Sequence, residues 1–369
     1  MKIAAVEAIH LRLDQVRMIA DGAQECLLIK ITTDSGLVGW GEVVSCAHIA
    51  RAIVEAPAAA PFRHGLASIL QGLNPLDRNH VHAALAEGTA WYGSSGIVRS
   101  TIGGVDMALW DIAARAADQP LRKLLNDQAV DEIPVYASLL WPDSPDEIAA
   151  KLENLNRPEL NAFKLGWGPM GRDRDLDIRL VAMAREVIGD GILMIDAGRV
   201  WDLQTARDRV EQFAPYAPRW LEEPLAPRDY EGYRELSADS LITIACGEFF
   251  TEVDEFKRLV TDCRVPVIQP DIGRVGGFTG ILAINRLLAN SGTMHIPHSF
   301  GTGILRAHTA QYVAAMCADP LLEYCFSDSP LSALLTADGM TLDGAVLKLG
   351  TLPGLGVTVD EDAMARYRV

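Results

Sequence analysis

The spacing of hydrophobic and polar positions changes near residue 130 and divides the chain into two regions. In the first region, residues 3–13 alternate as a strand does, and residues 26–43 resemble two strands around the turn signal Asp34-Ser35-Gly36. Helical periodicity then follows over residues 77–86 and over a long stretch from 98 to 125. Strands followed by helices predict an α+β domain over residues 1–130.

From Pro134 onward, short apolar runs alternate with amphipathic segments. The predicted strands are 135–140, 162–168, 192–196, 220–224, 242–248, 267–271, 294–298 and 321–324. The predicted helices are 145–155, 175–188, 203–216, 229–236, 252–261, 279–291 and 303–316. This alternation predicts a parallel sheet closed into a (β/α) barrel over residues 131–329. No GxGxxG follows the first strand of either region, which argues against a doubly wound dinucleotide-binding sheet. The remaining residues, 330–369, are too many for one more barrel helix, and we expect them to pack on the N-terminal domain.

Composition and charge exclude several classes of protein. The 369 residues carry a formal charge of −16, so a nucleic-acid or anionic-membrane partner, which needs a basic face, is not expected. The six cysteines are scattered and form no CxxC, which argues against a disulfide framework. No apolar run is long enough for a membrane span and no signal peptide is evident, so we expect a cytoplasmic protein.

Ionisable residues stand at the ends of seven consecutive predicted strands. In chain order they are Lys164, Asp196, Glu222 or Glu223, Glu248, Asp271, His298 and Glu323. Such residues are poor choices for the ends of apolar runs unless something pairs them. In a barrel these strand ends converge on one mouth, where catalytic groups gather.

Three of these acids indicate a metal site. Asp196, Glu222 and Glu248 follow one another at intervals of 26 residues, about the length of one β/α unit. Adjacent strands would therefore present one carboxylate each at the same height. Three packed carboxylates repel one another unless a hard divalent cation lies among them, and Mg²⁺ fits all-oxygen ligands best. Glu223, the next residue, is predicted to face the other side.

Asp271 and His298 end adjacent strands and together indicate a general base. A carboxylate beside an imidazole fixes its tautomer and raises its basicity. His295 lies three residues before His298, on the opposite face of the strand, and we assign it no role.

These residues together resemble the enolase superfamily, mandelate racemase subgroup. The resemblance rests on segments at the ends of the predicted barrel strands and on two segments of the N-terminal region. The segments are Lys164-Leu165-Gly166, Ile195-Asp196-Ala197-Gly198, Trp220-Leu221-Glu222-Glu223-Pro224, Gly247-Glu248, Gln269-Pro270-Asp271, Ile296-Pro297-His298-Ser299, Leu322-Glu323-Tyr324, Gly39-Trp40-Gly41-Glu42 and Ala108-Leu109-Trp110-Asp111. The resemblance implies an α+β capping domain over a modified (β/α)₇β barrel, with the C-terminal tail returning to the cap.

The resemblance also implies a chemistry. Family members bind Mg²⁺ through three acids, matching Asp196, Glu222 and Glu248, and abstract the proton α to a carboxylate to form an enediolate. Because that proton is weakly acidic, fixed positive charge must meet the developing dianion, and Lys164 would supply part of it. A protonated Glu323 would add a hydrogen bond to the same carboxylate. Asp271 followed by His298 belongs to the racemase and acid-sugar dehydratase type.

Two departures from the family pattern bear on the reaction. Strand two often reads Lys-x-Lys in the family, but Gly166 replaces the second Lys, and Gly198 replaces an Asn often found on strand three. The loss of that Lys leaves His298 as the base on one face of the enediolate. Racemisation with inversion needs an acid/base on each face, whereas one His can remove the α-proton and then protonate a departing 3-hydroxyl. The sequence therefore favours dehydration of an aldonic or aldaric acid to a 2-keto-3-deoxy acid.

Two alternatives remain open at this point. One is a racemase or epimerase of a 2-hydroxy or related acid, in which Tyr92, Trp167 or a group of a capping loop replaces Gly166. The other is a degenerate family member that keeps the metal for structure. Substrate contacts are expected from Trp167 and from capping loops 14–24 and 45–51, which hold Arg17, His48 and Arg51. The partner is thus a small carboxylate substrate, and the resemblance implies a homo-oligomer.

Overall fold

The N-terminal part of the molecule is an antiparallel three-stranded sheet covered by helices. A computed structural model of the chain describes residues 1–60, 62–333 and 335–369. The strands are β1 (Ile3–Arg12), β2 (Glu25–Thr33) and β3 (Val38–Val43), and β2 lies between the other two. The helices are α1 (Ala47–Glu55), α2 (Leu66–Leu70), α3 (Arg78–Thr89), α4 (Ile97–Ala116) and α5 (Leu121–Leu125). Apolar side chains of β1–β3, α1 and α4 form one buried cluster, so sheet and helices share a core.

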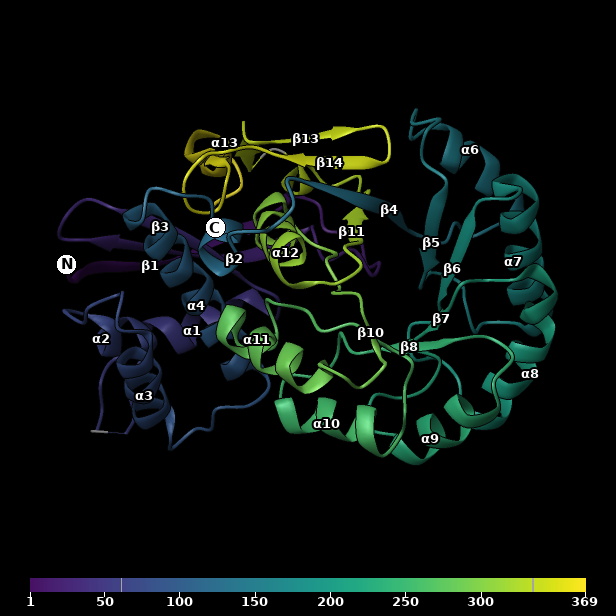
Figure 1. Cartoon of the computed structure of the whole chain (residues 1–369), viewed down its shortest axis with the longest axis horizontal. Coiled ribbons are helices and arrows are strands. Elements are labelled where there is room, and N and C mark those ends of the chain that lie inside the picture. Colours follow the sequence, from purple (N-terminus) through teal and green to yellow (C-terminus); the bar gives the residue numbers. More distant parts are fainter. Residues whose placement is uncertain (61, 334) are drawn as a thin grey trace.

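The central part is a (β/α)₇β barrel (Figure 1). Its strands are β4 (Glu132–Leu140), β5 (Ala162–Gly166), β6 (Ile192–Asp196), β7 (Leu221–Glu222), β8 (Ile244–Cys246), β9 (Val267–Ile268), β10 (Met294–His295) and β11 (Leu322–Cys325). The helices between them are α6 (Ile148–Glu153), α7 (Arg174–Ile188), α8 (Leu203–Phe213), α9 (Tyr230–Asp239), α10 (Val253–Thr261), α11 (Gly277–Leu288) and α12 (Gly303–Met316). Consecutive strands from β4 to β10 pair in parallel, and β11 pairs in parallel with β4. The predicted barrel is confirmed.

Short elements complete the chain. Single 3₁₀ turns lie at Pro145–Glu147, Ala214–Tyr216 and Pro330–Ser332, and the tail holds β12 (Thr336–Ala337), β13 (Met340–Asp343), β14 (Val346–Leu349), β15 (Thr358–Val359) and α13 (Glu361–Ala365). The tail runs over the top of the molecule in Figure 1, between the cap and the barrel. Its hairpin β13–β14 adds to barrel strand β4, while Leu355, Met364 and Tyr367 pack against β1–β3. The tail therefore contacts both regions, where the sequence indicated only the cap.

The long helix predicted over residues 98–125 is two helices in the structure. α4 ends at Ala116, Asp118 adopts a left-handed backbone with φ of 52°, and Pro120 precedes α5. Proline cannot donate to the helical ladder and disfavours helix in the residue before it, which explains the break.

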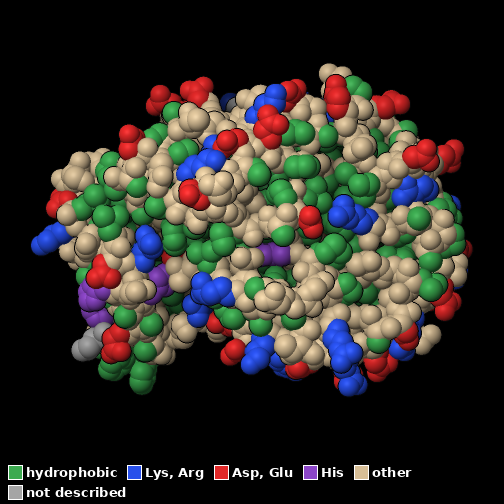
Figure 2. All heavy atoms as spheres, in the orientation of Figure 1, with side chains coloured by type: hydrophobic (Ala, Val, Ile, Leu, Met, Phe, Trp, Pro, Cys, Tyr) green, Lys and Arg blue, Asp and Glu red, His purple; other side chains and the backbone are tan. Residues whose placement is uncertain are grey.

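Three further observations concern the molecule as a whole. All six cysteines are free, in line with their scattered spacing. Within the described ranges, no helix is both long and apolar enough to cross a membrane. Acidic and basic side chains are intermixed over the face shown in Figure 2.

Candidate active site

The functional side chains form one layer inside the barrel, directly above an apolar layer. The apolar layer consists of Tyr136, Ala162, Met194, Trp220, Ala245, Val267 and Ile296, one from each of seven consecutive strands or strand ends. Residues two positions further along a strand point to the same side. Those residues include Ser138, Lys164, Asp196, Glu222, Gln269 and His298. The period of two therefore brings the predicted catalytic groups to the barrel mouth above a closed floor.

The structure brings together the three acids predicted to bind metal. Oxygen atoms of Asp196, Glu222 and Glu248 lie within 4.8 Å of one another, and all three residues are buried. Burial and the neighbouring carboxylates raise the pKa of Asp196 well above its usual value and also raise the pKa of Glu248. This mutual repulsion is the condition that a bound divalent cation relieves.

Neighbouring side chains fix the orientation of Glu222. Its Oε2 accepts hydrogen bonds from Trp220 Nε1 at 3.0 Å and Gln269 Nε2 at 2.7 Å. Its Oε1 accepts a hydrogen bond from Lys164 Nζ at 2.6 Å. Such outer partners orient a carboxylate for ligation.

Glu223 lies outside this cluster. Its Oε1 accepts the Gly247 backbone N–H at 3.0 Å, and its own backbone is left-handed, with φ of 45°. Burial and the charge of Glu248 raise its pKa to about 8. It thus supports the turn that carries Glu248.

The charges around the cluster fit a divalent cation. Five buried carboxylates, those of Asp196, Glu222, Glu248, Asp271 and Glu323, surround the two basic groups Lys164 and His298. Glu248 Oε2 is buried and lies 3.0 Å from His298 Nε2 without the alignment of a hydrogen bond. Buried anions need compensating charge, and oxygen-only donors suit Mg²⁺.

Asp271 and His298 form a hydrogen-bonded pair at the barrel mouth. Asp271 Oδ2 lies 2.7 Å from His298 Nδ1, and its Oδ1 accepts the Gly273 backbone N–H at 2.7 Å. Although burial favours the neutral ring, Glu248, Glu323 and Asp271 together raise the pKa of His298 to about 10. The pair leaves Nε2 as the ring nitrogen that faces the acid cluster.

Lys164 and Glu323 form a second ion pair, with Nζ 2.7 Å from Oε1. Burial opposes charge on both groups, yet the two carboxylates beside Lys164 raise its pKa well above the usual value. Lys164 and His298 in turn lower the pKa of Glu323 to about 2. Glu323 also accepts the Ser299 N–H on Oε2 at 2.7 Å. These contacts favour the anionic form of Glu323 over the protonated carboxyl group that the resemblance implies.

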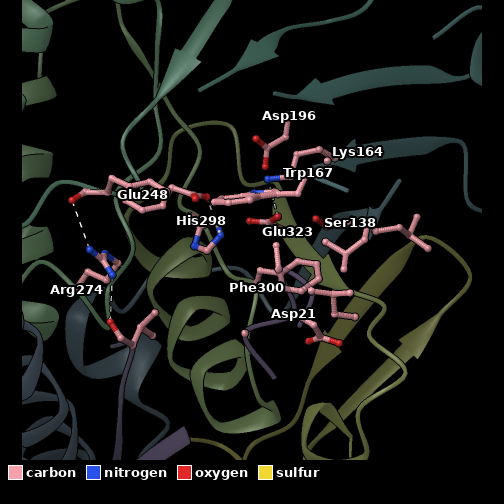
Figure 3. Close-up of a pocket in the computed structure, with 18 residues that line it drawn as sticks. Asp21, Ser138, Lys164, Trp167, Asp196, Glu248, Arg274, His298, Phe300 and Glu323 are labelled. Atoms are coloured by element: carbon pink, nitrogen blue, oxygen red, sulfur yellow. Dashed lines mark hydrogen bonds and ion pairs between the residues drawn. The ribbon is translucent and has the colours of Figure 1, made fainter. Parts of the chain in front are cut away.

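These groups line a cavity of about 360 Å³ between the barrel mouth and the capping loop (Figure 3). Lys164, Asp196, Glu248, His298 and Glu323 all line it. Asp21 also lines it, and this residue lies in the capping loop 14–24 that was predicted to meet substrate. Ser138, Phe249, Arg274 and Phe300 line it too and were not predicted. Of these four, Arg274 had a usable signal, because it lies three residues after the strand-end acid Asp271 and carries a charge.

Gly166 and Gly198 stand at the ends of strands two and three of the barrel, and neither offers a side chain that could act as a second base. A Cβ atom at Gly166 would lie 2.9 Å from Asp196 Oδ2, so a side chain there would displace the predicted metal ligand. A Cβ at Gly198 would lie 3.0 Å from the Trp167 ring. The Arg199 guanidinium lies 5.2 Å from the Trp167 ring centroid and 3.7 Å from that of Phe249. This part of the wall is therefore aromatic, backed by a cation.

The loop residues predicted to meet substrate are dispersed. Trp167 lines the cavity, whereas Arg17 lines a wider outer groove of about 1320 Å³ and lies 3.2 Å from Asp328. His48 does not reach the cavity, because it lies on α1 with its ring in edge contact with His10. Arg51 pairs with Glu55, one turn along the same helix.

Tyr92, named as a substitute second base, also lies away from the cavity. It follows α3, and its hydroxyl donates to the His64 carbonyl at 2.5 Å.

The comparisons with known proteins agree with this fold and site. The family model described as "Mandelate racemase / muconate lactonizing enzyme, N-terminal domain" matches residues 5–126, and "Enolase C-terminal domain-like" matches residues 147–363. The chain belongs to the enolase superfamily, in its mandelate racemase subgroup.

Similar proteins of named activity include dehydratases and cycloisomerases. D-galactonate dehydratase from Klebsiella pneumoniae is 30% identical over 91% of this chain and 89% of its own. D-galactarolactone cycloisomerase from Agrobacterium fabrum is 27% identical over 93% and 91%. The crystal structure of 3,6-anhydro-D-galactonate cycloisomerase from Zobellia galactanivorans superposes with a TM-score of 0.89 at 27% identity, covering 100% of both chains. A mandelate racemase/muconate lactonizing protein from Paracoccus denitrificans, complexed with magnesium, gives 0.86 at 25% identity, covering 100% of this chain and 97% of its own.

Proposed function

We propose that this protein is a Mg²⁺-dependent dehydratase of an aldonic or aldaric acid. In the proposed reaction the substrate loses its α-proton and its 3-hydroxyl, and the enol product tautomerises to a 2-keto-3-deoxy acid. The names of the relatives support an acid sugar as substrate. The geometry supports an elimination that uses one base.

The observation that carries the proposal is that one lining side chain is suited to shuttle a proton. The ionisable side chains on the described wall of the cavity are Asp21, Lys164, Asp196, Glu248, Arg274, His298 and Glu323. Lys164 is held as an ammonium ion by two carboxylates, and Glu323 as a carboxylate by that ammonium. Asp21 already accepts hydrogen bonds from the Ala23 N–H and the Ser327 hydroxyl. His298 remains as the group that can both accept and return a proton.

Asp196, Glu222 and Glu248 would hold the Mg²⁺ ion. When bound, it would supply positive charge that offsets these carboxylates and the charge developing on the substrate carboxylate. Because the ion would offset the negative charge of Glu248, we expect the pKa of His298 to fall toward the range in which a neutral imidazole accepts a proton.

In the proposed reaction, Lys164, His298 and Asp271 each have a separate role. Lys164 binds the substrate carboxylate through its ammonium group and stabilises the enediolate. His298 Nε2 takes the α-proton while Asp271 holds Nδ1, and the resulting imidazolium gives that proton to the departing hydroxyl as the C3–O bond breaks. One proton moves from carbon to oxygen, and one water molecule leaves.

Cycloisomerisation is the second candidate, because two full-length relatives carry that name. For a substrate whose C3 oxygen closes a ring, the same loss of the α-proton would open the ring without releasing water. Racemisation is less well supported, since Gly166 stands where the family often has a second Lys, and the cavity wall as described offers no other side chain in that role.

A stereochemically complete panel of aldonic, aldaric and 3,6-anhydro sugar acids, incubated with Mg²⁺, tests the proposal. The 2-keto product is detected with semicarbazide and its mass is measured. A product lighter by one water supports dehydration, and a product of unchanged mass supports cycloisomerisation. Epimerised substrate without a keto product, or neither keto product nor α-proton exchange across the panel, contradicts the proposal.

A further inference from the structure

A second group of metal-binding side chains lies in the capping domain, outside the site described above. His10 on β1, Glu25 on β2 and His48 on α1 each place one ligand atom within 4.8 Å of the other two. His10 Nε2 lies 2.7 Å from Glu25 Oε1, and the His10 and His48 rings meet edge to face at 4.7 Å between centroids. Three separate elements thus converge on one point.

The hydrogen bonding of His10 leaves one ring nitrogen unused. Its side chain is fully buried, Nε2 faces Glu25, and Nδ1 has no hydrogen-bond partner among the described residues. A buried polar atom without a partner is costly, and such atoms often mark a functional site. Histidine is the commonest metal ligand among side chains, and two imidazoles meet at this point.

The surroundings allow an ion to enter. The Glu25 side chain is 33% exposed and His48 is exposed, so the cluster opens to solvent on one side. Glu25 also lines the outer groove above the active site. Arg12 Nε, 3.7 Å from Glu25 Oε1, is the cation that competes for this carboxylate.

We propose that His10, Glu25 and His48 bind a divalent transition metal of the Zn²⁺ class, with water completing the coordination. Two nitrogens and one oxygen favour Zn²⁺ over Mg²⁺, whereas the oxygen-only cluster in the barrel favours Mg²⁺. The two sites therefore select different ions. The bound ion cross-links β1, β2 and the start of α1, which follows the cap strand beside the cavity.

The test uses the full-length protein in excess Mg²⁺, so that the barrel acids do not compete for the probe, which is Zn²⁺ alone. Zn²⁺ binding is measured by calorimetry and by metal analysis after gel filtration, together with the thermal midpoint. We expect one Zn²⁺ per chain and a rise of the midpoint by a few degrees.

The informative variants are His48→Ala and Glu25→Gln, because the His48 side chain is exposed and glutamine keeps an oxygen that can bond to His10. Each should weaken Zn²⁺ binding about tenfold or more and abolish the midpoint rise. His80→Ala is the matched control, since His80 is another exposed histidine in the first turn of a cap helix. It should bind Zn²⁺ as the unmodified protein does.

Substitution of Zn²⁺ by Co²⁺ provides a second readout. Histidine coordination should give visible absorption bands that His48→Ala removes. The proposal is overturned if no Zn²⁺ binds in excess Mg²⁺, or if His48→Ala binds it as tightly as His80→Ala. Neither readout depends on catalysis, so a failure here is separate from a failure of the proposed function.

Discussion

His298 is the residue on which the one-base mechanism depends. His298→Asn should lower the rate of dehydration by at least about 10²–10⁴-fold, the range typical of general acid–base catalysis, because no second lining group can take the α-proton. Asp271→Asn should be milder, since the ring remains but loses the carboxylate that orients Nδ1. Lys164→Met should be as severe as His298→Asn, through loss of charge stabilisation.

The decisive measurement is α-proton exchange in D₂O by His298→Asn, with the substrate and with its C2 epimer. We expect no exchange with either compound, together with unchanged Mg²⁺ affinity. Persistent exchange with one of them would reveal a base on the opposite face and favour the racemase interpretation.

Gly166 is predicted to matter through Asp196 rather than through the substrate. A methyl group at this position would lie 2.8 Å from Asp196 Cβ and 2.9 Å from its Oδ2, so Gly166→Ala should weaken Mg²⁺ binding and activity together, by about tenfold or more. Mg²⁺ titration by calorimetry provides the check. Gly189→Ala adds a methyl in open space far from the site and should lower stability alone, because Gly189 has a φ of 61°. Equal Mg²⁺ affinity in both variants would contradict this account.

The site residues that the sequence predicts correctly are those that lie at the ends of regular strands. Lys164, Asp196 and His298 come together because parallel strands end at one mouth and point inward every second residue. The sequence does not place His48 and Arg17 relative to the cavity, because nothing in a loop sequence specifies the path of the loop. Their polarity alone could not distinguish the cavity from the surface.

At the scale of the element, long periodic segments were predicted well and short ones poorly. The hairpin around Asp34-Ser35-Gly36 and the α7 helix follow their hydrophobic patterns closely. The α12 helix has the predicted bounds but is buried on nearly all sides, whereas the sequence indicates an amphipathic helix. The predicted strands 220–224 and 294–298 shrink to two paired residues each. Pro224 and Pro297 lie within these runs, and proline has no N–H to donate to the ladder of a sheet. α1 and α2 had not been predicted, since nine and five residues provide little periodicity.

A buried histidine on helix α12 should make the stability of the protein depend on pH. His308 on this helix is fully buried, and its Nε2–H donates to the Trp40 carbonyl of β3 at 2.9 Å. Burial lowers its pKa to about 3, against about 6.5 in the unfolded chain. The unfolded state therefore binds more protons between these values, so the stability contribution is complete above pH 6.5 and is lost as the pH falls.

His308→Gln keeps a donor for Trp40 but removes this titration. The unmodified protein should lose about 2 kcal/mol relative to this variant between pH 7 and pH 5. Urea unfolding of both proteins across that range measures the difference. A constant difference would mean that His308 does not titrate on unfolding.

At the scale of the whole molecule, cap, barrel and tail are joined at buried polar junctions. Glu42 of β3 accepts hydrogen bonds from Thr302 and from the Leu305 N–H at the start of α12. Arg122 of α5 pairs with Asp131 just before the barrel and donates to the Gly350 carbonyl of the tail. Buried polar contacts therefore hold the cap to the barrel and the tail, in addition to the apolar packing.

Asp111 on α4 is the junction whose loss should be most costly. It is fully buried, with Oδ2 accepting the Trp40 N–H at 3.0 Å and Oδ1 accepting the Leu355 N–H at 2.7 Å, so it ties the cap sheet to the tail. Arg115 Nε completes the set at 2.9 Å from Oδ1. Asp111→Ala leaves two buried N–H donors and a partly buried guanidinium without their acceptor. We therefore expect this substitution to lower the free energy of unfolding by about 2–4 kcal/mol.

Asp343→Ala is the matched control, because its ion pair with Lys348 is exposed to solvent and contributes little to stability. Urea unfolding compares the two, and limited proteolysis of Asp111→Ala should cut first in the tail. An equal loss in both variants would show that the cap and tail are joined by apolar packing alone.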